Sequence, residues 1–175
     1  MAISLYDLTV PTYLQGLAGL AQVLRKAAEH EEAQGRDPNG LVEARIIEDM
    51  FPLKLQVQRA ADHSAGALRD VSQGAFTMPT RGEFTYAELE ALVADTIQAL
   101  EGWRREDVEA LEGRPVLFNP GSMRMDFTAE AFLLSFSIPS FYFHLVTAYD
   151  ILRMKGAPIG KMDYLKQMRT TLSPA

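Results

Sequence analysis

The chemistry available to this chain rests on three imidazoles, His30, His63 and His144, because its 175 residues include no cysteine. The lack of thiols excludes a disulfide framework, a thiolate zinc site, an iron–sulfur cluster and a cysteine nucleophile. No His-x-x-x-His or Glu-x-x-His pair occurs, and the positions four residues before and after His144 are Ser140 and Ala148. Since catalytic zinc normally takes three protein ligands and a water, two separate histidines do not by themselves specify a metal site.

Three other side chains are candidates to line a groove around these histidines. Gln56 lies on the same helical line as His63, and Tyr149 and Asp150 follow closely after His144. Each also has a plainer interpretation, Tyr149 as a core or interface tyrosine and Asp150 as a surface carboxylate. The chain has no Gly-x-Ser-x-Gly elbow, no P-loop and no dinucleotide-binding glycine pattern, so no catalytic residue is assigned from sequence.

The charge and the apolar content of the chain limit the kinds of partner that it can bind. With 17 basic and 23 acidic residues the net charge is −6, which argues against duplex nucleic acid. No stretch approaches the roughly 20 uninterrupted apolar residues of a membrane span, and the N-terminal residues lack the basic start and apolar core of a signal peptide. We therefore expect a cytoplasmic protein of one domain, residues 1–175, with no nucleic-acid or membrane partner.

Apolar residues at spacings of three and four predict two helical segments in the first half of the chain. The first begins near Thr9–Pro11 and ends at Gly35. A connection follows, with one helical turn expected at Leu41–Ile47. The second segment begins in the region Asp49–Pro52, with proline in its first turn, and ends at Gly74.

Two further helical segments are expected in the second half. The third opens at Thr85 with a capping box to Glu88, and its region closes at Gly113. In residues 114–127 the apolar side chains no longer recur at helical spacings, which predicts a short hairpin or ordered loop. The fourth segment begins after Thr128, and Pro139 must kink or interrupt it, with Ser140 available to cap a second piece.

Four amphipathic segments favour an all-α four-helix bundle with a kinked fourth helix and a short insertion before it. At about 100° per residue, His144 lies about 60° and His63 about 90° from the centres of their apolar stripes, at the margins of the buried faces. His30 falls among glutamates and is expected at the surface. The aromatic run Phe141–Phe143 surrounds its helix, which suggests contact with a second subunit and a homodimer.

Four stretches together resemble an uncharacterised bacterial and fungal family similar to the DinB/YfiT-like metalloenzymes. They are Ser4–Pro11, Asp49–Leu53 with Gln56–Gln58, Pro139–His144 with Ala148–Tyr149, and Ile151–Arg153 leading to Gly160–Leu165. The resemblance covers nearly the whole chain. It implies a DinB-like four-helix bundle, commonly dimeric, without an established reaction.

In the wider superfamily the resemblance implies a divalent metal, often zinc or nickel, held by three histidines. One lies on the second helix, which His63 matches, and two form a His-x-x-x-His pair on the fourth, of which His144 matches one member. The other member is missing here. Either Tyr149 or Asp150 replaces it, or the groove binds something other than a metal.

Two functions are therefore expected. The first is a non-catalytic dimeric bundle with a degenerate metal site that binds a small ligand or a partner. The alternative is a divalent-metal-dependent enzyme, of transferase or hydrolase type, with His63 and His144 as ligands.

Overall fold

Helix α1 (Leu5–Ala33) begins four residues earlier than the sequence predicted. In this computed structural model, which describes residues 3–80 and 82–168, Ser4 and Asp7 form the capping box that starts the helix. Pro11 is then an internal residue of α1. Its missing N–H removes one hydrogen bond from the helix, and the reciprocal cap upstream supplies a stronger start signal than the proline itself.

The connection after α1 contains its helical turn earlier than expected. A 3-10 turn, η1, covers Pro38–Leu41, where the Asp37 carboxylate accepts a hydrogen bond from the Asn39 N–H at 2.9 Å. The expected turn at residues 41–47 is therefore wrong. The Asx turn at Asp37, followed directly by proline, starts the helical geometry three residues sooner.

The second helical segment is one continuous rod with a wide turn in its middle. Helix α2 (Leu53–Ala61) starts at Pro52, continues through the π-helical turn η2 (Asp62–Gly66) and ends as α3 (Ala67–Ser72). Gly74 closes it as predicted, at φ +83°, a conformation that favours glycine. No local pattern of residues predicts the π-helical turn.

The capping box predicted at the start of the third segment is confirmed. The Thr85 hydroxyl accepts from the Glu88 N–H, and the Glu88 carboxylate accepts from the Thr85 N–H at 2.7 Å. Helix α4 (Tyr86–Glu101) ends at Gly102, and a separate short helix, α5 (Arg105–Glu109), follows before the closing Gly113.

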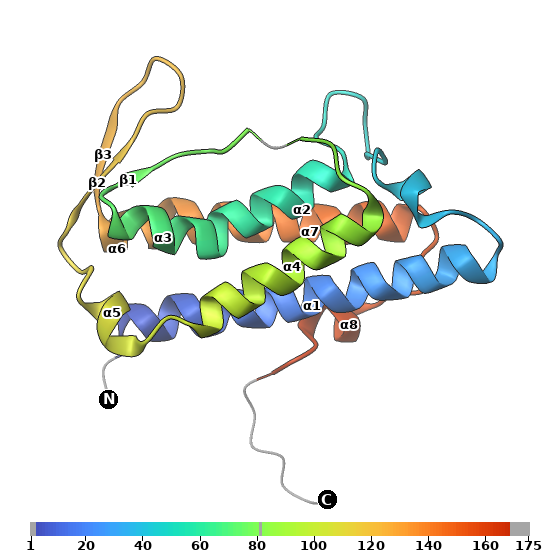
Figure 1. Ribbon diagram of the computed structural model, residues 1–175, viewed down its shortest axis with the longest axis horizontal. Coiled ribbons are helices and arrows are strands. Elements are labelled where there is room, and N and C mark those ends of the chain that lie inside the picture. Colours follow the sequence, from blue (N-terminus) through green and yellow to red (C-terminus); the bar gives the residue numbers. More distant parts are fainter. Residues whose placement is uncertain (1–2, 81, 169–175) are drawn as a thin grey trace, which may run out of the picture.

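The insertion before the fourth segment is a hairpin, which is one of the two forms expected from the sequence. Strands β2 (Pro115–Phe118) and β3 (Met125–Thr128) pair antiparallel, with Phe118 opposite Met125. A two-residue strand, β1 (Ala75–Phe76), adds in parallel to β2, with Phe76 opposite Phe118. The resulting three-stranded sheet lies at one end of the bundle (Figure 1).

The fourth segment bends without breaking. Helix α6 (Ala129–Phe132), the π-helical turn η3 (Leu133–Ser137) and α7 (Ile138–Met154) form one helix, and the expected restart at Ser140 is wrong. The wide turn ends immediately before Pro139. There the Ile138 N–H reaches back five residues to the carbonyl of Leu133, which accommodates the proline's missing donor within a continuous helix.

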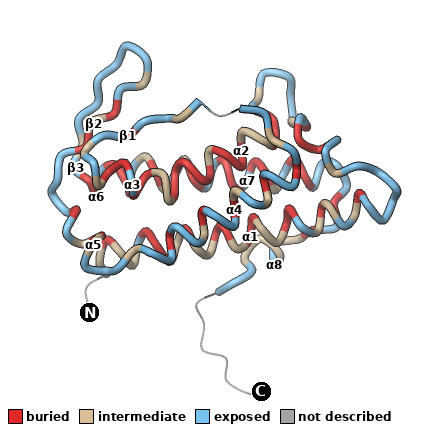
Figure 2. Tube along the Cα trace, in the orientation of Figure 1, coloured by how far each residue is buried: buried red, intermediate tan, exposed pale blue. Residues whose placement is uncertain are grey.

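Helices α2 and α3 run alongside α6 and α7, and α4 crosses α1 (Figure 1). Buried residues occupy the inner faces of all four segments, whereas the hairpin and the connection after α1 are mostly exposed (Figure 2). The short helix α8 (Lys161–Leu165) packs on α1. By length and composition, residues 129–154 are apolar enough to cross a membrane, but they include Phe132, Phe141 and Leu145, which are buried in the bundle core.

Candidate functional site

The two candidate histidines meet in the interior of the bundle. His63 lies in the wide turn η2 and is 1% exposed, while His144 on α7 is 9% exposed. Their rings are nearly parallel, at 10°, with centroids 5.8 Å apart. Phe76 stacks on His63 at 5.4 Å, and the edge of Phe136 meets the His63 ring at the same centroid distance.

A chain of hydrogen bonds fixes the backbone of His63. In η2 the Ala67 N–H donates to the carbonyl of Ser64, whereas a regular α-helix would direct it to His63. The hydroxyl of Ser137, in the opposite wide turn η3, donates to the His63 carbonyl at 2.7 Å. Since Ser137 has one proton, the buried Tyr13 hydroxyl, 2.8 Å away, must be the donor to its oxygen.

The protonation of His144 follows from its partner. The Gln56 side-chain amide donates from Nε2 to the Phe51 carbonyl at 2.9 Å, so its Oε1 is the atom that faces Nδ1 of His144 at 2.8 Å. An oxygen acceptor requires a proton on Nδ1. In neutral His144 the Nε2 atom is therefore the free acceptor.

Arg59 supplies the positive charge of the site. Its Nη1 donates to the Asp62 carboxylate at 2.9 Å and to the Pro79 carbonyl at 3.4 Å. Its Nε is buried and, like Nδ1 of His63, has no hydrogen-bond partner among the residues that the structure describes. Nε2 of Gln58, the neighbouring residue, is a third such atom in the described part of the chain. Atoms of this kind are uncommon, because buried polar groups are normally satisfied.

Both histidines are neutral at physiological pH. Burial, with smaller contributions from His144 and Arg59, lowers the pKa of His63 to about 3. Burial and the Arg59 charge lower the pKa of His144 to about 4. The same guanidinium thus acts on both rings, and the Asp62 carboxylate, 2.9 Å from its Nη1, offsets much of its charge.

The donor set does not complete the three-histidine pattern. Within residues 3–80 and 82–168, no group of three or more histidine, cysteine, aspartate or glutamate side chains is placed to hold a metal ion. The missing member of the helical pair is Ser140 or Ala148, and neither carries an imidazole or carboxylate. The residues present therefore do not fit a metal held by three protein ligands.

Of the three predicted groove-lining residues, the structure brings only Gln56 to the histidines. The Tyr149 ring packs against Tyr164 of α8, at a centroid distance of 6.0 Å. Asp150 lines a separate cavity of about 180 Å³ with Tyr149 and Lys161. Positions five and six residues after His144 point to other sides of α7, since each residue turns the helix by about 100°.

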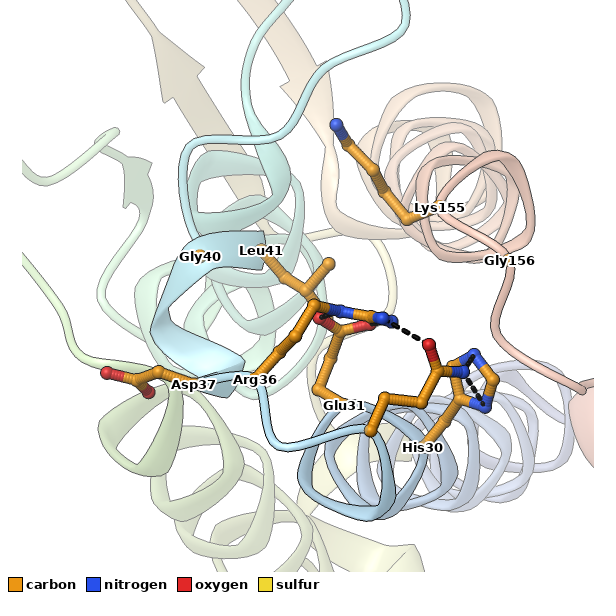
Figure 3. A pocket seen from close by; sticks show the side chains of 9 residues that line it. His30, Glu31, Arg36, Asp37, Gly40, Leu41, Lys155 and Gly156 are labelled. Carbon is orange, nitrogen blue, oxygen red and sulfur yellow. Dashed lines mark hydrogen bonds and ion pairs between the residues drawn. The ribbon is translucent and has the colours of Figure 1, made fainter.

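The third histidine belongs to a different part of the molecule. His30 contacts the Gln34 amide at 2.8 Å and lines an open cavity of about 690 Å³ between the C-terminal ends of α1 and α7 (Figure 3). Beside it, Arg36 donates two hydrogen bonds to the nearly buried Glu31, at 2.6 and 2.7 Å. This cation is thus already paired, and the Arg36 hydrogen bonds hold the pKa of Glu31 below its usual value.

Sequence reasoning missed Arg59, Ser137 and Phe76. Arg59 precedes His63 by four residues, a spacing that places both on one helix face and was the one available signal. Ser137 and Phe76 come from distant parts of the chain, and no local pattern marks them.

Comparisons with known proteins agree with this fold. Residues 5–165 match a domain of unknown function, DUF1993. A crystal structure of a DinB family member protein from Shewanella denitrificans is similar to the chain, with a TM-score of 0.80 and 31% identity, over 97% of this chain and 96% of that one. No curated protein matches. The chain therefore belongs to the DUF1993 family and has the DinB-like fold that its sequence predicted.

Proposed function

We propose that this protein is a homodimeric DinB-like bundle that binds a small ligand at its histidine cluster without a metal ion. The histidine cluster comprises Gln56, Arg59, His63 and His144. The observation that carries the proposal is the donor set: among the described residues, no third histidine, cysteine or carboxylate joins His63 and His144 in a group that could hold a metal ion. A metal in a DinB-like site would need such a third protein ligand.

The cluster supplies the hydrogen-bonding groups that a polar ligand needs. Nε2 of neutral His144 is an acceptor, and Nε of Arg59 and Nδ1 of His63 are buried without a hydrogen-bond partner among the residues that the structure describes. Small-molecule sites typically combine a few such groups with apolar walls, and Phe76 and Phe136 provide apolar surface against His63.

The alternative is a divalent-metal-dependent enzyme with His63 and His144 as ligands to zinc or nickel. One contact favours it. Metal-binding histidines usually donate their second N–H to an oxygen, and the bond from His144 Nδ1 to Gln56 leaves Nε2 free in that way.

Elemental analysis separates the two functions. Protein purified without a histidine tag is incubated with zinc and nickel, dialysed and analysed together with His63→Ala and His144→Ala. The proposal predicts no stoichiometric metal in any of the three proteins. One metal ion per chain in the parent, lost in both variants, would rule out the metal-free proposal.

The dimer rests on the outer face of α7. Phe143 is 61% exposed and Val146 is 42% exposed, an apolar pair one helical turn apart in the aromatic region from which the dimer was expected. Sedimentation equilibrium should give a dimer for the parent and a monomer for Phe143→Glu. The matched control is Met123→Glu on the hairpin, where the methionine is equally exposed. A parent that sediments as a monomer would rule out this part of the proposal.

A further inference from the structure

A cavity of about 350 Å³ lies between helix α4 and the rod formed by α2, η2 and α3. It is separate from the histidine cluster. The ring of His63 meets His144 on α7, whereas Ala65 and Gly66 of the same wide turn line this cavity. The volume is within the range of about 300–1,000 Å³ that is typical of small-molecule sites. The remaining lining residues are Ala61, Arg69, Asp95, Thr96, Ala99 and Trp103.

Small side chains keep the middle of the cavity open. Three alanines and Gly66 line it, and Ala99, the alanine of α4, is exposed. A Cβ added to Gly66 would have its nearest neighbour at 3.4 Å, the carbonyl oxygen of Ala61, and its three nearest atoms all belong to the same rod as Gly66 itself. The space toward α4 is therefore open at this level, and it can receive the apolar body of a ligand.

The two ends of the cavity carry different chemical groups. Trp103 packs against the hydrophobic core and lines one end. Asp95 lies eight residues earlier, which corresponds to about 12 Å along a helix, and Ala99 lies midway between them. The cavity thus combines an aromatic side chain at one end, a carboxylate at the other and a small side chain in between.

The charges of the lining residues favour a cation. Asp95 and Arg69 are the two charged residues among them. Arg69 is paired with the nearly buried Asp70 carboxylate, whose Oδ1 lies 2.8 Å from Nη2 and 2.9 Å from Nε. The Asp95 carboxylate, in contrast, has no ion pair or hydrogen bond within residues 3–80 and 82–168. Because Asp70 offsets the charge of Arg69, Asp95 gives the cavity a net negative charge.

We propose that this cavity binds a primary amine that carries an aromatic ring on a short alkyl chain. The ring lies against Trp103, the alkyl chain passes over Ala99, and the ammonium group lies at Asp95. An aromatic ring gains from contact with an indole beyond the area that it buries. An unpaired carboxylate favours an ammonium group over a neutral or negative one. The site is independent of the histidine cluster, so the inference goes beyond the proposed function.

Trp103 is the single tryptophan of the chain, so its fluorescence reports on this cavity directly. The whole protein is titrated with 3-phenylpropylamine and with three matched probes: 3-phenylpropanol has no charge, 3-phenylpropionate has the opposite charge, and propylamine has no ring. We expect saturable binding of 3-phenylpropylamine with a dissociation constant on the order of 1 mM. The alcohol and the acid should bind at least about 3-fold more weakly, and propylamine at least about 10-fold more weakly. Amide chemical shifts should centre on Gly66 and Ala99.

Two variants test the two ends of the ligand. Asp95→Asn should weaken the amine about 3–5-fold and leave the alcohol unchanged, because an exposed ion pair contributes about that much. Its control is Glu101→Gln, an exposed acid of α4 outside the cavity. Ala99→Leu fills the middle of the cavity and should weaken amine and alcohol alike, by about 10-fold or more. Its control is Ala94→Leu, an exposed position of the same helix that does not line the cavity.

Several results would overturn the inference. These are equal binding of the amine and the alcohol, tighter binding of the acid, an Asp95→Asn variant that binds the amine as the parent does, shifts centred on the cavity around His30, or no saturable change in Trp103 fluorescence up to about 10 mM amine. None of them bears on the metal-free function, because elemental analysis decides that separately.

Discussion

The hydrogen-bond chain from Tyr13 through Ser137 to the His63 carbonyl makes a quantitative prediction. All three groups are buried, and Ser137 contributes both a donor and an acceptor. Replacing Ser137 with alanine strands the Tyr13 hydroxyl and the His63 carbonyl together. Since each buried unsatisfied group costs about 1–3 kcal/mol, we expect Ser137→Ala to lower the free energy of unfolding by about 4 kcal/mol.

Tyr13→Phe should lower the free energy of unfolding by far less. It removes one partner but leaves the bond from Ser137 to the His63 carbonyl intact, so about 1 kcal/mol is expected. In the double variant only the His63 carbonyl is stranded, at about 2 kcal/mol. Adding Tyr13→Phe to Ser137→Ala should therefore stabilise the protein, although Tyr13→Phe destabilises the parent.

The assay is urea unfolding followed by circular dichroism at pH 7, arranged as a double-mutant cycle. Ser64→Ala is the matched control, because Ser64 is equally buried but donates to Ala60 and Ala61 within its own helical segment. That change should cost less than about 0.5 kcal/mol. Additive effects of the Tyr13 and Ser137 changes, or a control as costly as Ser137→Ala, would refute the reasoning.

Two further predictions concern the buried histidines and the contact between α1 and α8. Because the pKa of His63 and of His144, about 3 and about 4, lies below the unfolded value of about 6.5, the unfolded chain binds more protons below pH 6.5. The contribution of the neutral histidines to the free energy of unfolding is complete above pH 6.5 and is lost as the pH falls, by about 2 kcal/mol per histidine between pH 6.5 and pH 5. Urea unfolding at several pH values should show that the free energy of unfolding of His63→Gln depends on pH about half as steeply as that of the parent. An unchanged pH dependence would contradict the burial argument. A Cβ on Gly19 would lie 2.0 Å from the Tyr164 carbonyl oxygen, so Gly19→Ala should displace α8 and cost about 1–3 kcal/mol, whereas Gly40→Ala, with nothing within 4 Å, should be neutral. Equal melting temperatures for the two alanine variants would exclude this packing.

The parts of the fold that the sequence predicted are those with local chemical signals. The capping box at Thr85 and the glycine stop at Gly74 involve residues within one or two turns of each other. Helix α1 begins before the predicted start at Thr9–Pro11, because the Ser4–Asp7 capping box, and not Pro11, begins the helix. Strand β1 is only two residues long and forms by pairing with β2, so it has no alternating apolar pattern that could predict it.

The wide turns explain why the site was only partly predictable. A π-helical turn inserts one residue, which rotates everything after it by about 100° without changing composition. Regular helix geometry places His63 at the margin of its apolar face, whereas the structure, in which His63 lies within η2, buries it almost completely. The meeting of His63 with His144 was expected from the family pattern, but Ser137 acts through contacts across the bundle, and Arg59 is held by Asp62 and by Pro79, which follows the rod.

The most direct test of a metal-free histidine cluster is a long-range proton–nitrogen correlation spectrum of the imidazoles, recorded without and with one equivalent of zinc. The Gln56 contact predicts His144 with its proton on Nδ1 and an unprotonated Nε2. Because no third ligand joins the two histidines among the described residues, neither His63 nor His144 should respond to zinc. A saturable shift of the ring nitrogens of both histidines at one equivalent would contradict the account.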